Sequence, residues 1–174
     1  GEYSSIGGRM FQGTEREVVV LFADLRGFTR LAETRLPYDV VFILNRYFTA
    51  MGGAIEDQGG HVDKFVGDGI IALFGLDAPP PTAARQALAA AAAMGEALAA
   101  LNRELAPTLR EPLRMGIALH GGPAIVGEVG WGQAGTLTPV GDTVKTESRL
   151  EPRTKGLGVA LLVSETVGQR AGAP

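Results

Sequence analysis

The sequence predicts an α+β domain in which a ferredoxin-like antiparallel sheet carries helices packed on one side. Short apolar runs and stretches of helical spacing follow one another in the order βααββαββαβ, which is the first indication. Two of the predicted strands are joined only by Gly67 and Asp68, a tight hairpin of antiparallel neighbours. The 174 residues are 45% hydrophobic and 20% charged, which suits one globular domain with a sizeable core.

The first half of the chain predicts three strands and two helices. Residues 17–24 are apolar without alternation, as in a central strand covered on at least one face. A helix is expected to begin near Phe28, and a longer one to run from Pro37 to about Ile55, where apolar residues recur at helical spacing. The two strands of the hairpin are predicted at 61–66 and 69–74.

The second half begins with a break at Pro79-Pro80-Pro81, after which Thr82 is expected to cap a long alanine-rich helix that ends before Pro107. Two strands, 113–120 and 124–131, are expected on either side of Gly121-Gly122-Pro123. A helix at 143–151 and a strand at 159–163 complete the set. Residues 1–16 are expected to be a linker or an expression remnant, and residues 17–174 the domain itself.

Composition excludes several classes of protein. The net charge of -3 gives no general attraction to nucleic acid or to an anionic membrane, so any phosphate must be bound by local cations. The absence of cysteine excludes disulfides, thiolate zinc sites and cysteine nucleophiles. The longest apolar stretch, 83–101, contains Arg85 and Glu96 and is not a membrane span. With no visible signal peptide, a cytoplasmic domain without membrane or nucleic-acid contact is expected.

Two aspartates lie where a hydrophobic strand runs into glycine, and together they predict a divalent-metal site. Asp24 ends the run 18–23 and is followed by Leu25-Arg26-Gly27, while Asp68 lies between Gly67 and Gly69. Mg²⁺ takes few protein oxygens and completes its octahedron with phosphate and water, so two carboxylates on neighbouring strand ends suit it.

Each aspartate also has an ordinary structural explanation. Asp68 alone is common turn chemistry, and Asp24 alone could cap the helix near Phe28. The two aspartates taken together favour a functional site. The Asp24 segment continues into Gly27-Phe28-Thr29, whose backbone N–H groups are placed to cradle phosphate at a helix start.

With these motifs the chain resembles the class III nucleotidyl cyclases, the catalytic domains of adenylate and guanylate cyclases, and most of all the bacterial adenylate cyclases. The resemblance covers roughly residues 17–167, with four motifs in the family's order. They are Phe22-Ala23-Asp24-Leu25-Arg26-Gly27-Phe28-Thr29, Lys64-Phe65-Val66-Gly67-Asp68, Arg114-Met115-Gly116-Ile117-Ala118-Leu119-His120-Gly121-Gly122, and Val140-Gly141-Asp142-Thr143-Val144 continuing to Ser148-Arg149-Leu150-Glu151.

The resemblance implies a two-metal mechanism that makes a 3′,5′-cyclic nucleotide and pyrophosphate. Asp24, Asp68 and the carbonyl of Leu25 would bind two Mg²⁺ or Mn²⁺ ions, one activating the ribose 3′-hydroxyl and the other holding the triphosphate. Arg114 would contact the phosphates, and Arg149 would stabilise charge that develops at the α-phosphate.

Lys64 and Thr138 match the family's pair of base-reading residues. Adenine offers an acceptor at N1 and a donor at N6, while lysine only donates and a threonine hydroxyl accepts, so ATP is the expected substrate. Outside this register, Lys64 would be a solvated strand residue and Thr138 a β-former before Pro139.

Two departures from the family pattern bear on activity. Lys145 stands where the family usually has an asparagine that orients the ribose, and in the predicted helix it shares a face with Arg149. It either adds positive charge near the phosphates or points to solvent, pairs with Asp142 and leaves catalysis weakened; both interpretations stand. The family's usual C-terminal strand pair, which supplies a further phosphate-binding lysine, is expected to be missing.

The resulting hypothesis is an adenylate cyclase domain that works as a homodimer. The family builds each site between two subunits, with the aspartates from one and Lys64, Thr138 and Arg149 from the other, and this chain carries both sets. The alternatives are a weak or silent cyclase-like module that binds nucleotide or dimerises, and a guanylate cyclase. A regulatory domain elsewhere in a longer protein is expected.

Overall fold

The computed structural model describes residues 2–6, 9–127, 130–133 and 158–172, with side chains from Thr14 to Val126 and from Gly158 to Gly172. The helices are α1 (Phe28–Glu33), α2 (Pro37–Asp57), α3 (Pro80–Leu105) and α4 (Glu165–Ala171). The strands are β1 (Glu2–Ile6), β2 (Arg9–Arg26), β3 (His61–Val66), β4 (Gly69–Phe74), β5 (Arg114–Gly127), β6 (Gly130–Gln133) and β7 (Val159–Val163).

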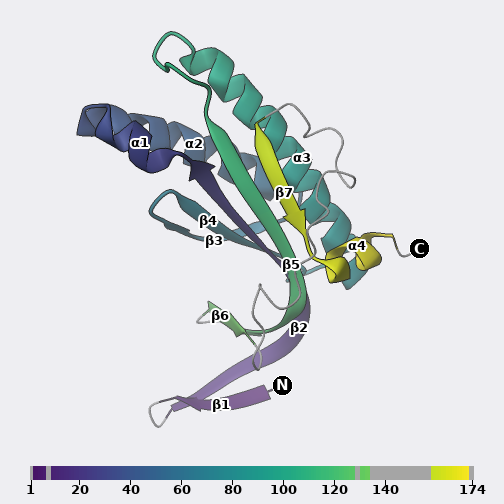
Figure 1. Cartoon of the computed structure of the whole chain (residues 1–174). Coiled ribbons are helices and arrows are strands. Elements are labelled where there is room, and N and C mark those ends of the chain that lie inside the picture. Colours follow the sequence, from purple (N-terminus) through teal and green to yellow (C-terminus); the bar gives the residue numbers. More distant parts are fainter. Residues whose placement is uncertain (1, 7–8, 128–129, 134–157, 173–174) are drawn as a thin grey trace.

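The described strands form one sheet with β2 and β5 at its centre (Figure 1). Its main path is β3-β4-β2-β5-β6, and every neighbouring pair on that path is antiparallel. Strand β1 pairs with the first part of β2, and β7 pairs in parallel with β5. The predicted α+β sheet with helices on one side is confirmed, and the β5–β7 pair makes the sheet mixed.

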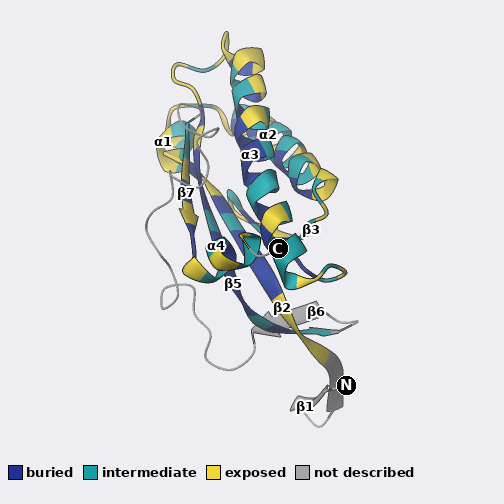
Figure 2. Cartoon of the chain, turned by 90° about the vertical axis from the view of Figure 1, so that its right-hand side faces the viewer, coloured by how far each residue is buried: buried dark blue, intermediate teal, exposed yellow. Residues whose placement is uncertain are grey.

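The helices cover one face of the sheet and bury the main core there (Figure 2). Period-two alternation decides which side chains take part, since Leu21, Ala23 and Leu25 of β2 face the helices while Phe22 and Asp24 face the other way. The alanine-rich helix α3 buries alanines as well as leucines, which lets it approach the sheet and α2 closely. The opposite face holds only a small apolar cluster among the described residues, around Val18, Val20, Leu73 and Ala124.

The expected break at residues 121–123 is wrong, because β5 runs unbroken from Arg114 to Gly127 and pairs with β2 along its whole length. Gly121 is needed for packing instead of turning: a Cβ there would lie 3.1 Å from Cγ2 of Thr166 and 3.2 Å from Cγ2 of Val167. The glycine therefore lets α4 pack onto the strand. On its other edge β5 pairs with β7 up to Leu119 and with β6 from Ala124, which leaves room in the ladder for Pro123.

Helix boundaries also differ from the expectation. Helix α3 begins at Pro80, and its N-cap position is held by Pro79 without a side-chain hydrogen bond, so Thr82 is not its cap. Prolines suit this first turn because the N–H groups there have no intrahelical acceptor. Helix α4 was not predicted, and its Ser164 cap accepts a hydrogen bond from the N–H of Val167.

Two further predictions concern the segment before the domain and a helix near its C-terminal part. The segment before Glu17 forms a hairpin from β1 and the first half of β2, so it has more structure than a linker; the domain boundary stays a prediction. The helix expected at 143–151 lies outside the described residues.

Candidate active site

The two predicted metal ligands come together on adjacent strands. Asp24, near the end of β2, is paired in the ladder with Gly69, the first residue of β4, and Asp68 lies in the turn just before it. The carboxylate of Asp68 accepts a hydrogen bond of 3.2 Å from the N–H of Leu25. Gly67 adopts a positive φ of 60° and closes this turn, which brings the second carboxylate back towards β2.

Tyr47 lies beneath the two carboxylates, in the core of α2. Its ring is fully buried, and its hydroxyl donates to the sulfur of Met115 at 3.7 Å. Burial, and then the negative charges of Asp24 and Asp68, raise the pKa of Tyr47 above its usual value. Asp24 and Asp68 therefore both lie near the same phenol. The sequence placed Tyr47 on the apolar face of a helix, with no signal that the face lay under the site.

Two arginines face each other beside Asp24. Arg26 and Arg114 are direct partners in the β2–β5 ladder and share the face of the sheet that carries Asp24. The Nε of Arg26 is 3.9 Å from Oδ1 of Asp24, and its guanidinium covers Gly116 so closely that a Cβ at that position would collide with it. Like charges directly opposite in a ladder repel, so this pair favours an anion nearby. Arg26 belongs to the first family motif, but no role was predicted for it; its two-residue spacing from Asp24 was the available signal.

Helix α1 starts where the resemblance places a phosphate-binding turn. Gly27 is its N-cap, with φ of 69° and ψ of 22° and no side-chain cap, so Asp24 does not cap the helix. The carbonyl of Gly27 accepts from the N–H of Leu31, while the N–H groups of Phe28 and Thr29 belong to the first turn and have no intrahelical acceptor.

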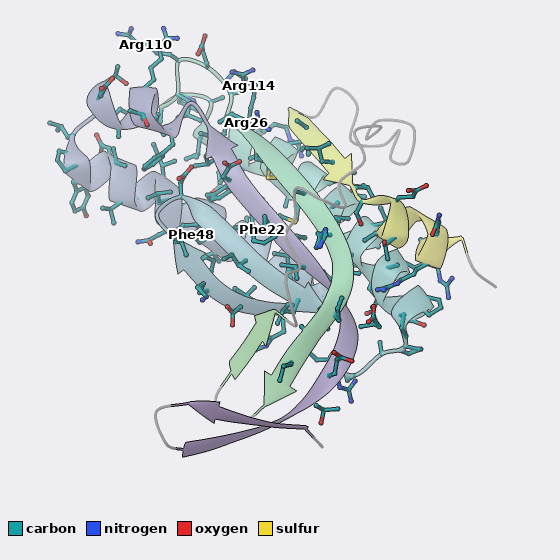
Figure 3. All side chains as sticks on the ribbon, turned by 60° about the horizontal axis from the view of Figure 1, so that its bottom comes forward. Phe22, Arg26, Phe48, Arg110 and Arg114 are labelled. Atoms are coloured by element: carbon teal, nitrogen blue, oxygen red, sulfur yellow. The ribbon has the colours of Figure 1, made fainter. Side chains whose placement is uncertain are left out.

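Two cavities of similar size meet at this end of the sheet. The first, about 530 Å³, lies on the face away from the helices and is mainly apolar, with Phe22, Ile71 and Leu162 in its wall and Asp24 at one end. The second, about 550 Å³, lies between α1 and the connection from α3 to β5, and its wall is rich in arginine. Arg26 lines both, and Figure 3 shows it gathered with Arg110 and Arg114 at the same end of the molecule.

The oxygen ligands at this site suit a hard divalent cation whose coordination sphere is completed by the substrate. Within the described part of the chain, no group of three or more His, Cys, Asp or Glu side chains is placed to hold a metal ion. Asp24 is largely exposed and already has a cationic neighbour in Arg26, while Asp68 is held by a single backbone N–H. Two carboxylates and the carbonyl of Leu25 would leave most positions of Mg²⁺ or Mn²⁺ to phosphate oxygens and water.

Lys64 lies apart from this group, on the edge strand β3. It forms an ion pair of 3.5 Å with its neighbour Asp63 and is exposed. The next residue, Phe65, packs against Phe48 of α2 with ring centroids 4.4 Å apart, so Lys64 points to the face that carries Asp24. Thr138, Lys145 and Arg149 lie outside the described residues.

Known proteins identify the family. The model of the adenylate and guanylate cyclase catalytic domain matches residues 11–171. The chain belongs to this family. Among curated relatives, this cyclase domain is 36% identical over 163 residues to an adenylate cyclase of Anabaena cylindrica. The matched region covers 91% of this chain and 32% of that protein. The domain is 32% identical to adenylate cyclase 1 of Rhizobium meliloti, over 95% of this chain and 25% of the relative. The cyclase domain therefore spans about a third or less of these relatives.

Solved structures agree with the fold of this class III cyclase domain. The guanylyl cyclase Cya2 superposes with a TM-score of 0.73 at 32% identity, covering 94% of this chain and 82% of that one. The adenylyl cyclase CyaB from P. aeruginosa superposes with a TM-score of 0.70 at 24% identity, covering 92% and 82%, and supports the fold alone. No helix in the described part of the cyclase domain is both long and apolar enough to cross a membrane.

Proposed function

We propose that this domain is an adenylate cyclase that converts ATP to 3′,5′-cyclic AMP and pyrophosphate as a homodimer. The observation that carries the proposal is the meeting of Asp24 and Asp68 at adjacent strand ends, with Asp68 held by the N–H of Leu25. Two Mg²⁺ or Mn²⁺ ions held by these carboxylates and the Leu25 carbonyl would lower the pKa of the ribose 3′-hydroxyl and neutralise the triphosphate.

The chain's own residues would position the nucleotide. Arg114 lies opposite Arg26 beside the carboxylates, which suits contact with the triphosphate, and the first turn of α1 at Gly27-Phe28-Thr29 offers backbone N–H groups to it. Lys64 and Thr138 are proposed to bind adenine through N1 and N6, and Arg149 to stabilise the charge on the α-phosphate.

The open face of the sheet supports a site shared by two subunits. Asp24 and Lys64 both point to this face, yet Lys64 is not among the residues lining the cavity beside Asp24. In a symmetric dimer the lysine of one subunit would complete the aspartate site of the other, and both sites would be equivalent.

The direct test is a cyclase assay with Mg²⁺ or Mn²⁺ and ATP, run over a range of protein concentrations. Asp24→Asn should lower the rate about a hundredfold or more, because the metal site loses a charged ligand. Asp57→Asn at the exposed end of α2 removes the same charge away from the site and is the matched control. An unchanged rate in Asp24→Asn would refute the metal assignment. Full specific activity at a dilution where the chain is shown to be monomeric would refute the dimer.

A mixing experiment separates the shared site from a site within one chain. Asp24→Asn and Arg149→Ala should each be inactive alone, since each damages one half of every site. Random exchange of subunits makes half of the dimers mixed, each with one intact site of two, so activity should return to about a quarter of the wild type. No recovery after subunit exchange would refute the composite site.

A silent nucleotide-binding or dimerisation module is the second candidate, and Lys145 favours it. A lysine cannot accept a hydrogen bond as an amide can, so the ribose-orienting role of asparagine is not preserved in kind. Nucleotide binding without turnover, with activity restored by Lys145→Asn, would select this candidate. A guanylate cyclase is the lesser enzyme alternative, raised by the similarity to Cya2; comparing turnover of ATP and GTP decides it, and Lys64 predicts ATP.

A further inference from the structure

Glycines lie on both sides of Asp24 in the sheet. Its ladder partner on β4 is Gly69, and its ladder partner on β5 is Gly116. No side chain therefore stands directly across from the carboxylate on either neighbouring strand. The nearest charged residue along β2 on the same face is Arg26, two positions further on, because side chains of a strand alternate between its faces. The surroundings of Asp24 are thus open except for this one arginine of its own strand.

The guanidinium of Arg26 uses the space that Gly116 leaves. A Cβ at Gly116 would lie 2.7 Å from the Nε of Arg26 and 2.9 Å from its Cζ, so the guanidinium lies directly over this glycine. Arg114 is the ladder partner of Arg26 and carries the same charge, which favours a position of the Arg26 side chain towards Asp24 (Figure 3). The Nε of Arg26 then lies 3.9 Å from Oδ1 of Asp24.

This ion pair is loose enough to exchange. A separation of 3.9 Å is too long for a hydrogen bond, and the side chains of Arg26 and Asp24 are 55% and 61% exposed, so water can replace either partner at little cost. Asp68 is held differently, by the backbone N–H of Leu25 at 3.2 Å. The two carboxylates are therefore not equivalent, since one is held by a fixed neutral donor and the other by the cationic end of a flexible side chain.

We infer that Arg26 and the metal ion compete for the carboxylate of Asp24, so that the arginine weakens metal binding by the nucleotide-free domain. Two cations within a few ångströms of one carboxylate repel each other, and the binding of one disfavours the other. An ion that arrives with a triphosphate also brings negative charge for the displaced guanidinium, so the competition is strongest for the ion alone. Arg26 is then a positioning residue, and this inference rests on the proposed function, in which Asp24 is a metal ligand.

The test measures Mn²⁺ binding by the whole nucleotide-free domain, with the electron paramagnetic resonance signal of free Mn²⁺ as the readout. Arg26→Gln should bind Mn²⁺ about fivefold more tightly than wild type, which corresponds to the upper range for an exposed ion pair. Arg26→Lys keeps the charge and should stay within about twofold of wild type. Arg30→Gln is the matched control and should also stay within about twofold, because this exposed arginine of α1 has no carboxylate partner among the described residues.

A double variant tests whether the effect passes through Asp24. The gain from Arg26→Gln should disappear in the Asp24→Asn background, because the arginine then has no carboxylate to hold. Equal Mn²⁺ affinity in wild type and Arg26→Gln, including no measurable binding by either, would overturn the inference. An equal gain in Arg26→Lys or Arg30→Gln, or a gain that persists in the Asp24→Asn background, would overturn it as well.

A parallel cyclase assay separates this inference from the proposed function. A domain in which Arg26→Gln tightens Mn²⁺ binding, but which makes no cyclic nucleotide, would overturn the cyclase proposal alone. Synthesis of cyclic nucleotide by a domain whose Mn²⁺ affinity is unchanged in Arg26→Gln would overturn the inference about Arg26 alone.

Discussion

Replacing Tyr47 with phenylalanine should change how the domain's stability depends on alkaline pH. The hydroxyl of Tyr47 is buried against the sulfur of Met115, and burial together with the charges of Asp24 and Asp68 raises its pKa. The unfolded chain ionises this tyrosine near pH 10, whereas the folded chain keeps it protonated to higher pH. The native state then holds the proton that the unfolded state has lost, so stability is fully present below about pH 10 and falls as pH rises above it.

While the folded tyrosine stays neutral, the contribution of Tyr47 to the free energy of unfolding changes with pH only because this residue ionises in the unfolded chain. Between about pH 9 and about pH 11, wild type should lose about 1.4 kcal/mol of stability that Tyr47→Phe does not lose. Near neutral pH the two proteins should differ by less than about 1 kcal/mol, because a thioether sulfur is a weak acceptor.

Urea unfolding followed by circular dichroism, at several pH values from neutral to alkaline, measures the difference directly. The exposed Tyr38 provides the control, since Tyr38→Phe should leave the wild-type pH dependence in place. The same alkaline loss of stability in wild type and Tyr47→Phe would refute the reasoning, because it would mean that the phenol titrates alike in both states.

Three further changes test the packing of the helices and single hydrogen bonds. Gly121→Ala should cost about 1–2 kcal/mol by pushing on α4, whereas Gly52→Ala, with open space around it in α2, should stabilise by up to about 1 kcal/mol; thermal denaturation of both compares them. Ser164→Ala should cost about 1 kcal/mol or more, because its hydroxyl caps α4 and also accepts from the N–H of Gly121; unchanged unfolding in urea would contradict this. Asp68→Ala should be less stable than Asp68→Asn by about 1 kcal/mol in EDTA, since only the amide keeps an acceptor for Leu25, and equal melting temperatures would contradict it.

Local signals were enough to predict much of the sheet and its helices. The hairpin around Gly67 has the strand boundaries that the sequence predicted, because a two-residue turn between apolar runs leaves little freedom in register. Helix α2 begins at Pro37 as expected, since proline suits a first turn and the apolar spacing that follows is long and regular. Asp68 lies in the turn of this hairpin as expected, whereas its place beside Asp24 depends on the long-range pairing of β2 with β4.

The errors arose where distant residues decide the structure. A Gly-Gly-Pro sequence signals a turn locally, but at 121–123 the glycine makes room for a helix more than forty residues later in the chain, and α4 is too short for periodicity to reveal. The arginine-rich cavity beside α1 was equally hidden, since Arg35 and Arg110 line it only because α1 packs beside the α3–β5 connection. Such contacts depend on tertiary structure, which no window of sequence contains.

Alternate residues at the end of β2 serve either the hydrophobic core or the candidate site. Ala23 and Leu25 point into the core, while Phe22, Asp24 and Arg26 point to the open face and the cavities beside it. In a mutational scan of this strand, tolerance should therefore oscillate with a period of two. Substitutions at the first set would lower the amount of folded protein, and those at the second would leave folded protein with altered ligand binding. Adjacent residues of one strand would then evolve under separate constraints, one set by stability and the other by chemistry.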